Sequence, residues 1–421
     1  PSAAALSSGL VSSPVKTPGI VLSGGGMRGA YEAGVIAGVM AALGRKPEDP
    51  PLFRVMSGTS VGAINAAFLA SAADRGDHRV NDLLGIWRSL RLETHAKLRL
   101  MGLMRWPRRI TELFRTVPAS IPPGTSLLDT RELEKLVAGA VDFAKLRDNV
   151  REGRVHALLI AALHVVSGKT TVFAEVSPHI HYAPSVSGTR VARVESIGID
   201  HVLASAAIPL LFPTRKVGER FYCDGGLRFN TPIAPAIRAG ADPLLVISVS
   251  HRVSDVEARA LEVEHEEVEG MDLGPMFLIG KLLNALLLDP VKQDLQVLKR
   301  LNELVEVLES TLGEAEFARV QEVLVKSRGV GYRRLDTLVF TPSEDIGRLA
   351  GEYLRTMRRT TELNPLLERF LARSAVEGMS QEADWASYLL FDGGFAERLI
   401  DLGLSDARAR ADEICAIFAA C

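Results

Sequence analysis

The sequence predicts a three-layer α/β protein with a mainly parallel central sheet and a C-terminal helical extension. Near the N-terminus, two short apolar runs each precede a glycine-containing turn and a segment of helical composition. This gives the order strand, helix, strand, helix, which joins strands in parallel through right-handed crossovers. Further apolar runs follow up to about residue 250, and beyond it apolar residues recur at helical spacing among charges.

The first βαβα unit spans residues 19–73. Residues 19–23 form an apolar run that ends in glycines, so we expect a buried strand that enters a tight turn. Residues 28–43 are rich in Ala, Val, Ile and Met and predict the first helix. Residues 53–57 predict the second strand, and residues 61–73 predict a second helix with very small side chains.

Later strands are expected at four places. Residues 157–165 and 170–175 are apolar runs on either side of Ser167-Gly168, and this arrangement predicts a hairpin. Residues 221–223 run into an Asp-Gly-Gly turn, and residues 244–249 form a strongly β-branched run. Both predict further strands of the same sheet.

The chain divides into three expected parts. Residues 1–16 are small and polar and predict a flexible lead-in, residues 17–250 are expected to form the main α/β domain, and residues 251–421 a mainly helical extension that packs on it. Within the extension, the periodicity of residues 291–326 predicts two amphipathic helices. Residues 335–341 are expected to return one strand to the sheet.

Composition excludes several classes of protein. The 421 residues are 47% hydrophobic and 24% charged, which allows a large core and excludes a disordered chain. A net charge of -2 gives no general electrostatic case for nucleic acid, and three scattered cysteines are too few for a disulfide framework or a zinc site. The sequence has no apolar run long enough for a membrane span and no signal-peptide pattern. We therefore expect a soluble, cytoplasmic protein with peripheral membrane contact, of undetermined oligomeric state.

Ser60 lies at the centre of Gly58-Thr59-Ser60-Val61-Gly62, between an apolar run and a helix-forming run. In a Gly-x-Ser-x-Gly turn, the two glycines let the backbone turn sharply, so that the hydroxyl projects above the N-terminus of the helix. A serine hydroxyl is a weak nucleophile until a neighbouring base takes its proton. Ser60 is therefore a candidate nucleophile, although glycine-serine pairs also occur in ordinary turns.

A second motif, Gly24-Gly25-Gly26-Met27-Arg28-Gly29, follows the first strand. It fits a dinucleotide fingerprint, but Glu48 and Asp49, the acidic residues at the required distance, precede the second strand instead of ending it. A Walker loop is excluded because no Gly-Lys-Ser/Thr follows. Two interpretations remain: an oxyanion hole of backbone N–H groups beside the Arg28 cation, or a tight turn without chemistry.

Asp224 is the candidate base. It ends a predicted strand and begins the turn Asp224-Gly225-Gly226. Asp-Gly is common in hairpin turns, which is the purely structural interpretation. A carboxylate at a strand end beside two glycines can also approach Ser60 and take its proton. The sequence supports a Ser–Asp dyad only if the two strand ends meet in space.

The glycine loop, the Ser60 turn and the Asp224 turn occur in this order, each after a strand, and here the sequence resembles the patatin-like phospholipase family. The resemblance covers roughly residues 17–250 and includes the connecting segments 206–213 and 230–232. It implies an acyl-ester hydrolase of lipids, without metal or organic cofactor, in which Ser60 is the nucleophile and Asp224 the base. The implied oxyanion residues are Gly24, Gly25, Gly26 and Arg28, and the implied motif residues around them are Gly29, Gly58, Gly62, Gly225 and Gly226.

Two alternatives stay open for the function. A Ser-His-Asp hydrolase would use His251 or His265, which follow Asp224 in the required order, although that fold usually places several strands before its nucleophile. A lipid-binding or scaffold module would keep the same fold without hydrolysing anything.

Two segments are candidates for contact with lipid. Residues 97–115 interleave basic side chains with Met, Trp and Phe, a composition that suits an anionic interface. Their alternative is a helix whose apolar side packs on the core. Residues 276–288 are mostly apolar and predict a lid, a membrane contact, or a helix in core or dimer packing.

Overall fold

The computed structural model describes residues 16–46, 48–95, 97–98, 128–184, 188–209, 211–251, 289–360 and 383–419. Nearly all of the expected lead-in, the basic segment beyond residue 98 and the apolar segment 276–288 lie outside the described residues.

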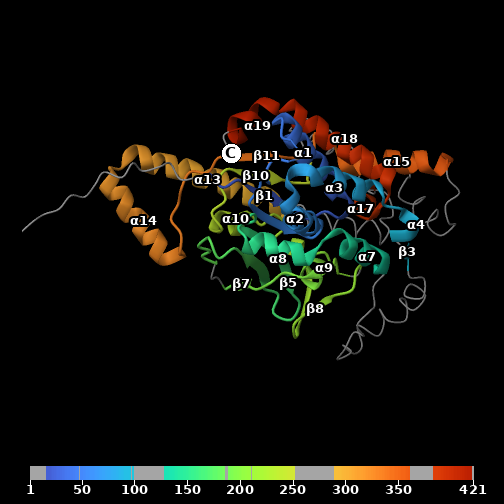
Figure 1. The fold of residues 1–421 in the computed structure, drawn as a ribbon, viewed down its shortest axis with the longest axis horizontal. Coiled ribbons are helices and arrows are strands. Elements are labelled where there is room, and N and C mark those ends of the chain that lie inside the picture. Colours follow the sequence, from blue (N-terminus) through green and yellow to red (C-terminus); the bar gives the residue numbers. More distant parts are fainter. Residues whose placement is uncertain are drawn as a thin grey trace, which may run out of the picture.

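Within the described ranges, nine strands form one central sheet (Figure 1). Five of them pair in parallel, in the order β11 (Thr337–Phe340), β10 (Leu244–Ile247), β1 (Gly19–Leu22), β2 (Val55–Thr59) and β5 (Ala157–His164). The predicted α/β fold with a mainly parallel sheet is confirmed. β11 lies in the segment where a late strand was expected and forms one edge of the sheet.

Antiparallel pairing begins at β5. The expected hairpin is present, because β6 (Thr170–Val176) pairs antiparallel with β5, and β7 (Arg190–Val194) then pairs parallel with β6. A second hairpin, β8 (Arg215–Val217) and β9 (Arg220–Asp224), joins the sheet through β5. The outer part of the sheet is therefore mixed, and the part around β1 and β2 is parallel.

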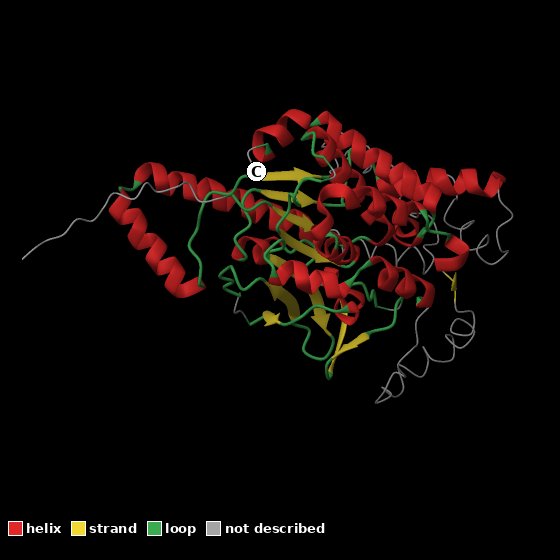
Figure 2. Ribbon diagram, viewed as in Figure 1, coloured by secondary structure: helices red, strands yellow, loops and turns green. Residues whose placement is uncertain are grey.

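Helices cover both faces of the sheet (Figure 2). Ile20 and Leu22 of β1 belong to the core on one face and Val21 to the core on the other, as alternation along a strand requires. All three side chains are fully buried, which explains why the strand is a continuous apolar run. The first face packs against α1 (Gly29–Ala42), α2 (Val61–Ser71), α18 (Gly393–Ala409) and α19 (Ala411–Phe418); the second packs against α10 (Ile233–Arg238) and α13 (Asp289–Thr311).

The remaining elements surround this frame. The helices are α3 (Arg79–Arg88), α4 (Leu92–His95), α7 (Arg131–Ala140), α8 (Phe143–Arg151), α9 (Ile199–Ser205), α14 (Glu314–Arg328), α15 (Ile346–Thr360) and α17 (Ala383–Leu389). Short 3₁₀ turns occupy Gly26–Arg28, Ala73–His78 and Gly225–Leu227, and a small second sheet pairs β3 (Lys97–Leu98) with β4 (Leu128–Asp129). No described helix has both the length and the hydropathy that a bilayer span requires.

The C-terminal helices share the core of the α/β part. α18 lies against α1 so closely that a Cβ atom at Gly34 would stand 2.3 Å from the carbonyl oxygen of Ile400. A Cβ atom at Gly403 would stand 2.5 Å from the carbonyl oxygen of Tyr31. α14 and the end of α13 that leads to it, by contrast, extend away from the body at the left of the view (Figure 1).

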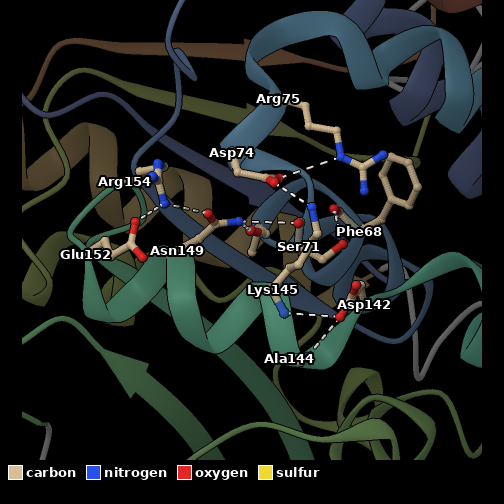
Figure 3. Close-up of polar contacts among 11 residues, drawn as sticks. Phe68, Ser71, Asp74, Arg75, Asp142, Ala144, Lys145, Asn149, Glu152 and Arg154 are labelled. Carbon is tan, nitrogen blue, oxygen red and sulfur yellow. Dashed lines mark hydrogen bonds and ion pairs between the residues drawn. The ribbon is translucent and has the colours of Figure 1, made fainter.

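Polar contacts tie the C-terminal end of α2 to α8 (Figure 3). The side-chain amide of Asn149 donates to the carbonyl oxygens of Ala70 (2.9 Å) and Ser71 (3.2 Å), which have no partner within the helix. Lys145 adds an ion pair with Asp74 at 2.7 Å. The helix that begins directly after Ser60 is therefore held firmly at its far end.

Candidate active site

Ser60 joins β2 to α2 in a strained backbone conformation. Its φ is 55° and its ψ is −124°, and among the described residues it is the one non-glycine residue with positive φ. Strained residues of this kind cluster at functional sites. The neighbouring glycines provide the necessary space, because a Cβ atom at Gly58 would lie 2.3 Å from the Gly62 carbonyl oxygen, and one at Gly62 would lie 2.4 Å from that of Leu22. This is the geometry of a nucleophile elbow.

Ser205, at the end of α9, holds the elbow in place. Its hydroxyl oxygen accepts a hydrogen bond from the Ser60 backbone N–H at 2.8 Å, and its hydroxyl donates to the carbonyl oxygen of Ala161 at 2.6 Å. Ser205 is fully buried, so it gives the strained turn a fixed partner away from water. Because the Ser60 N–H is bonded to Ser205, it is not a free donor for a substrate oxygen.

The register of the sheet brings Asp224 beside Ser60. β2 pairs with β5 up to Thr59, which lies opposite Ala161, and β9 pairs with β5 from Asp224, which lies opposite Ala162. Since β6 occupies the other edge of β5 at these positions, β2 and β9 share one edge and meet end to end. The end of β9 thus reaches the point where the chain turns at Ser60.

The Asp224 carboxyl group is fully buried and is oriented by one backbone donor. Its Oδ1 accepts from the Gly226 N–H at 2.7 Å, and its Oδ2 has no partner with the geometry of a full hydrogen bond. Burial raises the pKa of Asp224 to about 7, and this effect exceeds the lowering of the pKa by the Ser60 hydroxyl and the Gly226 N–H. Oδ2 is therefore the atom available to receive a proton from Ser60.

The glycine loop offers two free donors. The Gly24 N–H donates to the side-chain oxygen of Asn230 at 2.9 Å, and the Asn230 amide donates back to the Gly24 carbonyl at 3.2 Å. In the described part of the chain, the N–H groups of Gly25 and Gly26 have no such acceptor. Gly26 lines the same pocket as Ser60 and has φ 56°, which favours glycine. Gly25 and Gly26 are thus the loop residues that can bind an oxyanion.

The Arg28 side chain binds the C-terminal part of the chain. Its Nε donates to the Ser387 hydroxyl at 2.8 Å, and its guanidinium lies 4.3 Å from the centre of the Tyr388 ring. A further contact runs to the Val249 carbonyl at 3.5 Å. These contacts join the glycine loop to α17, whereas the expected help of the Arg28 cation to the oxyanion stays a prediction.

A second buried carboxyl group, Glu32, lies behind the glycine loop. Its Oε2 accepts from the side-chain amide of Asn65 at 2.9 Å, and the same amide donates to the Gly29 carbonyl at 3.1 Å. The Trp87 indole N–H donates to Asn65 Oδ1 at 3.2 Å and completes the network. Burial raises the pKa of Glu32 well above its usual range and so favours the neutral form of its carboxyl group.

Ser60 also lines an apolar pocket. Its wall combines side chains of α2, α3 and α7 with the segment after α9. Leu, Ile, Val and Phe dominate this wall, and its charged members, Glu134 and Arg215, form an ion pair with each other. Such a lining binds hydrocarbon and disfavours a polar substrate.

Among the described residues, no histidine contacts Ser60 or Asp224 in the way that a Ser-His-Asp triad requires. No described histidine hydrogen-bonds to Ser60 or Asp224, and a ring nitrogen of His251 lies 2.9 Å from the Pro342 carbonyl oxygen. His265, the other candidate for a Ser-His-Asp triad, lies outside the described residues.

Three supporting residues had no assigned role in the sequence. Each contacts a backbone group of the site: Ser205 and Asn230 lie 145 and 206 residues from their partners in the chain, and Asn65 lies 36 residues from its partner. For Asn230 the sequence did contain a clue, because residues 230–232 belong to the segments that resemble the family. For Ser205 and Asn65 the sequence contained no such clue, because a single small polar residue within an apolar helical run forms no recognisable motif.

Comparison with known proteins gives a family match for about half of the chain. Residues 20–237 match the family model described as Patatin-like phospholipase. A curated relative, the "cGAMP-activated phospholipase" of Pseudomonas aeruginosa, is 26% identical over 213 residues, which are 51% of this chain and 53% of the relative. The chain thus spans about half the length of that relative.

Two solved structures show more distant likeness. VipD from Legionella pneumophila aligns over 92% of this chain and 67% of its own, with 16% identity and a TM-score of 0.34. The ExoU–SpcU complex of the type III secretion system of Pseudomonas aeruginosa aligns over 94% of this chain and 75% of the matched chain, with 17% identity and a TM-score of 0.25.

Proposed function

Because this chain belongs to the patatin-like phospholipase family, we propose that it hydrolyses carboxylic ester bonds of lipids through a Ser60 acyl-enzyme, with Asp224 as the base. The observation that carries the proposal is the meeting of Ser60 and Asp224 on one edge of β5, beside an apolar pocket that Ser60 lines. Family membership supports lipid hydrolysis in general. The dyad and the oxyanion donors are our own assignment.

In the proposed reaction, the Ser60 oxygen attacks the ester carbonyl carbon while Asp224 Oδ2 takes the hydroxyl proton. The carbonyl oxygen becomes negative and accepts hydrogen bonds from the N–H groups of Gly25 and Gly26. When the tetrahedral intermediate collapses, the alcohol leaves with the proton from Asp224. Water then attacks the acyl-enzyme, Asp224 takes one of its protons, and release of the fatty acid restores Ser60.

The pocket supports a long acyl chain as the bound part of the substrate. Ser60, Ile64 and Phe68 line it in succession along one face of α2. A helix rises 1.5 Å per residue, so Phe68 lies about 12 Å beyond Ser60 along the axis. An extended acyl chain of roughly ten carbons covers that length. We therefore propose medium to long acyl esters as substrates, in preference to acetyl esters.

A serine-directed fluorophosphonate probe tests the nucleophile directly. The wild-type protein should be labelled, and the Ser60→Ala variant should not, because the hydroxyl oxygen forms the covalent bond to phosphorus. The Ser71→Ala variant is a matched control, since Ser71 is a buried serine on the same helix, bonded to the Phe68 carbonyl. A folded wild-type protein that is not labelled would contradict the proposal.

A further inference from the structure

Two neighbouring hairpin tips expose apolar side chains to solvent. The turn between β5 and β6 carries Val165 and Val166, which are 46% and 84% exposed. The adjacent β8–β9 hairpin carries Phe221, which is 43% exposed. The Val165 N–H donates to the Phe221 carbonyl at 2.9 Å, so the two tips form one continuous surface, which we call the hairpin tips (residues 165–169 and 216–221).

The hairpin tips lie beyond the same end of the sheet as Ser60, which is the end where the parallel strands β2 and β5 finish. β5 runs parallel to β2 and continues past the level of Ser60, because Thr59 lies opposite Ala161. Val165 is three residues beyond Ala162, which places it about 10 Å past the catalytic level. β8 begins at Arg215 in the pocket wall and leads directly to the tips, at the lower end of the view (Figure 1).

Positive charge surrounds this apolar surface. Lys169, Lys216, Arg220 and Arg228 are all exposed, and Arg228 donates to the Gly168 carbonyl at 3.0 Å. Glu219 is the one acidic residue of the two tips, and it pairs with Lys216. Lys169 and Arg220 form no ion pair within the part of the chain that the structure describes. Exposed apolar side chains within a basic rim are the pattern of a protein surface that binds anionic lipid.

We propose that the hairpin tips dock on an anionic lipid surface and so hold the opening of the pocket against it. The choice of lipid as the occupant rests on the proposed function. In this arrangement Val165, Val166 and Phe221 enter the boundary between headgroups and acyl chains, and the basic side chains contact lipid phosphates. A lipid then reaches Ser60 along the β8 side of the pocket without crossing bulk water.

Vesicle sedimentation with the full chain tests the docking surface independently of catalysis. The Ser60→Ala variant serves as the background, so that no lipid is consumed. It should bind phosphatidylcholine vesicles that contain phosphatidylglycerol more tightly than pure phosphatidylcholine vesicles, and salt should weaken the binding. Lys169→Gln together with Arg220→Gln should weaken binding about 30-fold, at about fivefold for each charge.

The apolar contribution to vesicle binding is tested with Val166→Asp and Phe221→Asp. These variants should weaken binding at least as strongly as Lys169→Gln together with Arg220→Gln. Val307→Asp on α13 is the matched control, because Val307 is 58% exposed and lies on a remote helix. Unchanged binding of the tip variants, or an equal loss in the control, would overturn the proposal.

A direct measurement covers the case in which a variant fails to fold. A Val166→Trp variant should be quenched by vesicle-bound brominated phosphatidylcholine more strongly than the parent protein, which has three tryptophans, and equal quenching of the two bound proteins would overturn the proposal. Hydrolysis of a soluble p-nitrophenyl ester by tip variants with an intact Ser60 should stay unchanged. If no ester is hydrolysed but the binding pattern holds, the proposed function fails and the docking surface stands.

Discussion

The regions around Glu32 and Asp224 bury the same chemical group in different surroundings. Both carboxyl groups are fully buried, burial raises the pKa of both, and each has one oxygen without a hydrogen-bond partner. Glu32 lies between helices and accepts from the Asn65 amide, whereas Asp224 lies at a strand end beside Ser60. Burial alone therefore does not make a base: the carboxyl group must also face a nucleophile, with a pKa near the working pH.

The largest expected effect comes from making the same change in both regions. Asp224→Asn should lower kcat/KM for an ester substrate about 10²- to 10⁴-fold, because an amide cannot accept the Ser60 proton. Glu32→Gln should leave kcat/KM within a fewfold of wild type, since Glu32 does not face Ser60 and burial favours its neutral form, which an amide resembles. Steady-state kinetics on both variants measure this difference in kcat/KM. An equal loss of kcat/KM in the two variants would contradict the assignment of Asp224, and not Glu32, as the base.

The pH dependence of activity separates the same two groups. The base acts in its ionised form, and the pKa of Asp224 is about 7, so kcat/KM should fall tenfold per pH unit below about pH 7 and level off above it. The Glu32→Gln variant should keep the same midpoint. A profile that stays flat between pH 5 and pH 7 would show that Asp224 is not the titrating base.

The comparison of Asp224 with Glu32 also depends on the backbone at Ser60, because Asp224 can act as a base only if the Ser60 hydroxyl is correctly oriented. Ser205→Ala removes the acceptor of the Ser60 N–H and should lower kcat roughly 10- to 100-fold with little change in KM. Ser205→Thr retains the hydroxyl and should restore part of the activity. The Ser71→Ala control should keep full kcat; if it loses as much as Ser205→Ala, the loss reflects general destabilisation.

The smallest expected effect concerns stability. A carboxyl group whose pKa is raised in the folded state stabilises the protein fully only below its unfolded pKa, and this stability is lost as pH rises. For Glu32 the loss begins above about pH 4.5 and continues upward, because its folded pKa lies well above that value. Glu32→Gln should therefore lose less free energy of unfolding than wild type as the pH rises from about 4.5 to 7.

Urea denaturation at both pH values measures this difference in the free energy of unfolding. The Asp224→Asn variant is a useful companion, because it lacks the loss that Asp224 contributes in the wild type, and that loss should end near pH 7, at the folded pKa of Asp224. An identical pH dependence of stability in wild type and Glu32→Gln would contradict a raised pKa of Glu32 in the folded state.

Local sequence was sufficient for the strands around Ser60 and for the candidate reactive groups. Apolar runs predicted β1 and β10 because a parallel strand is buried on both faces, so most side chains along it are apolar. β2 also holds the buried hydroxyl groups of Ser57 and Thr59, and β7 and β8 were not predicted. The glycines around Ser60 predicted a sharp turn because a side chain at Gly58 or Gly62 would meet backbone within 2.4 Å. Both constraints act between neighbours in the chain and therefore leave a pattern in it.

Tertiary structure decided what surrounds these groups. The approach of Asp224 to Ser60 depends on β2 and β9 sharing one edge of β5, and the anchoring of Ser60 depends on Ser205, 145 residues further along the chain. The glycine loop likewise depends on Asn230, which takes up the Gly24 N–H and leaves Gly25 and Gly26 as free donors. By itself the sequence determined the fold class and the candidate dyad. The free donors, the anchor of the elbow and the charge state of each carboxyl group depend on long-range packing, because burial and partner geometry exist only in the folded chain.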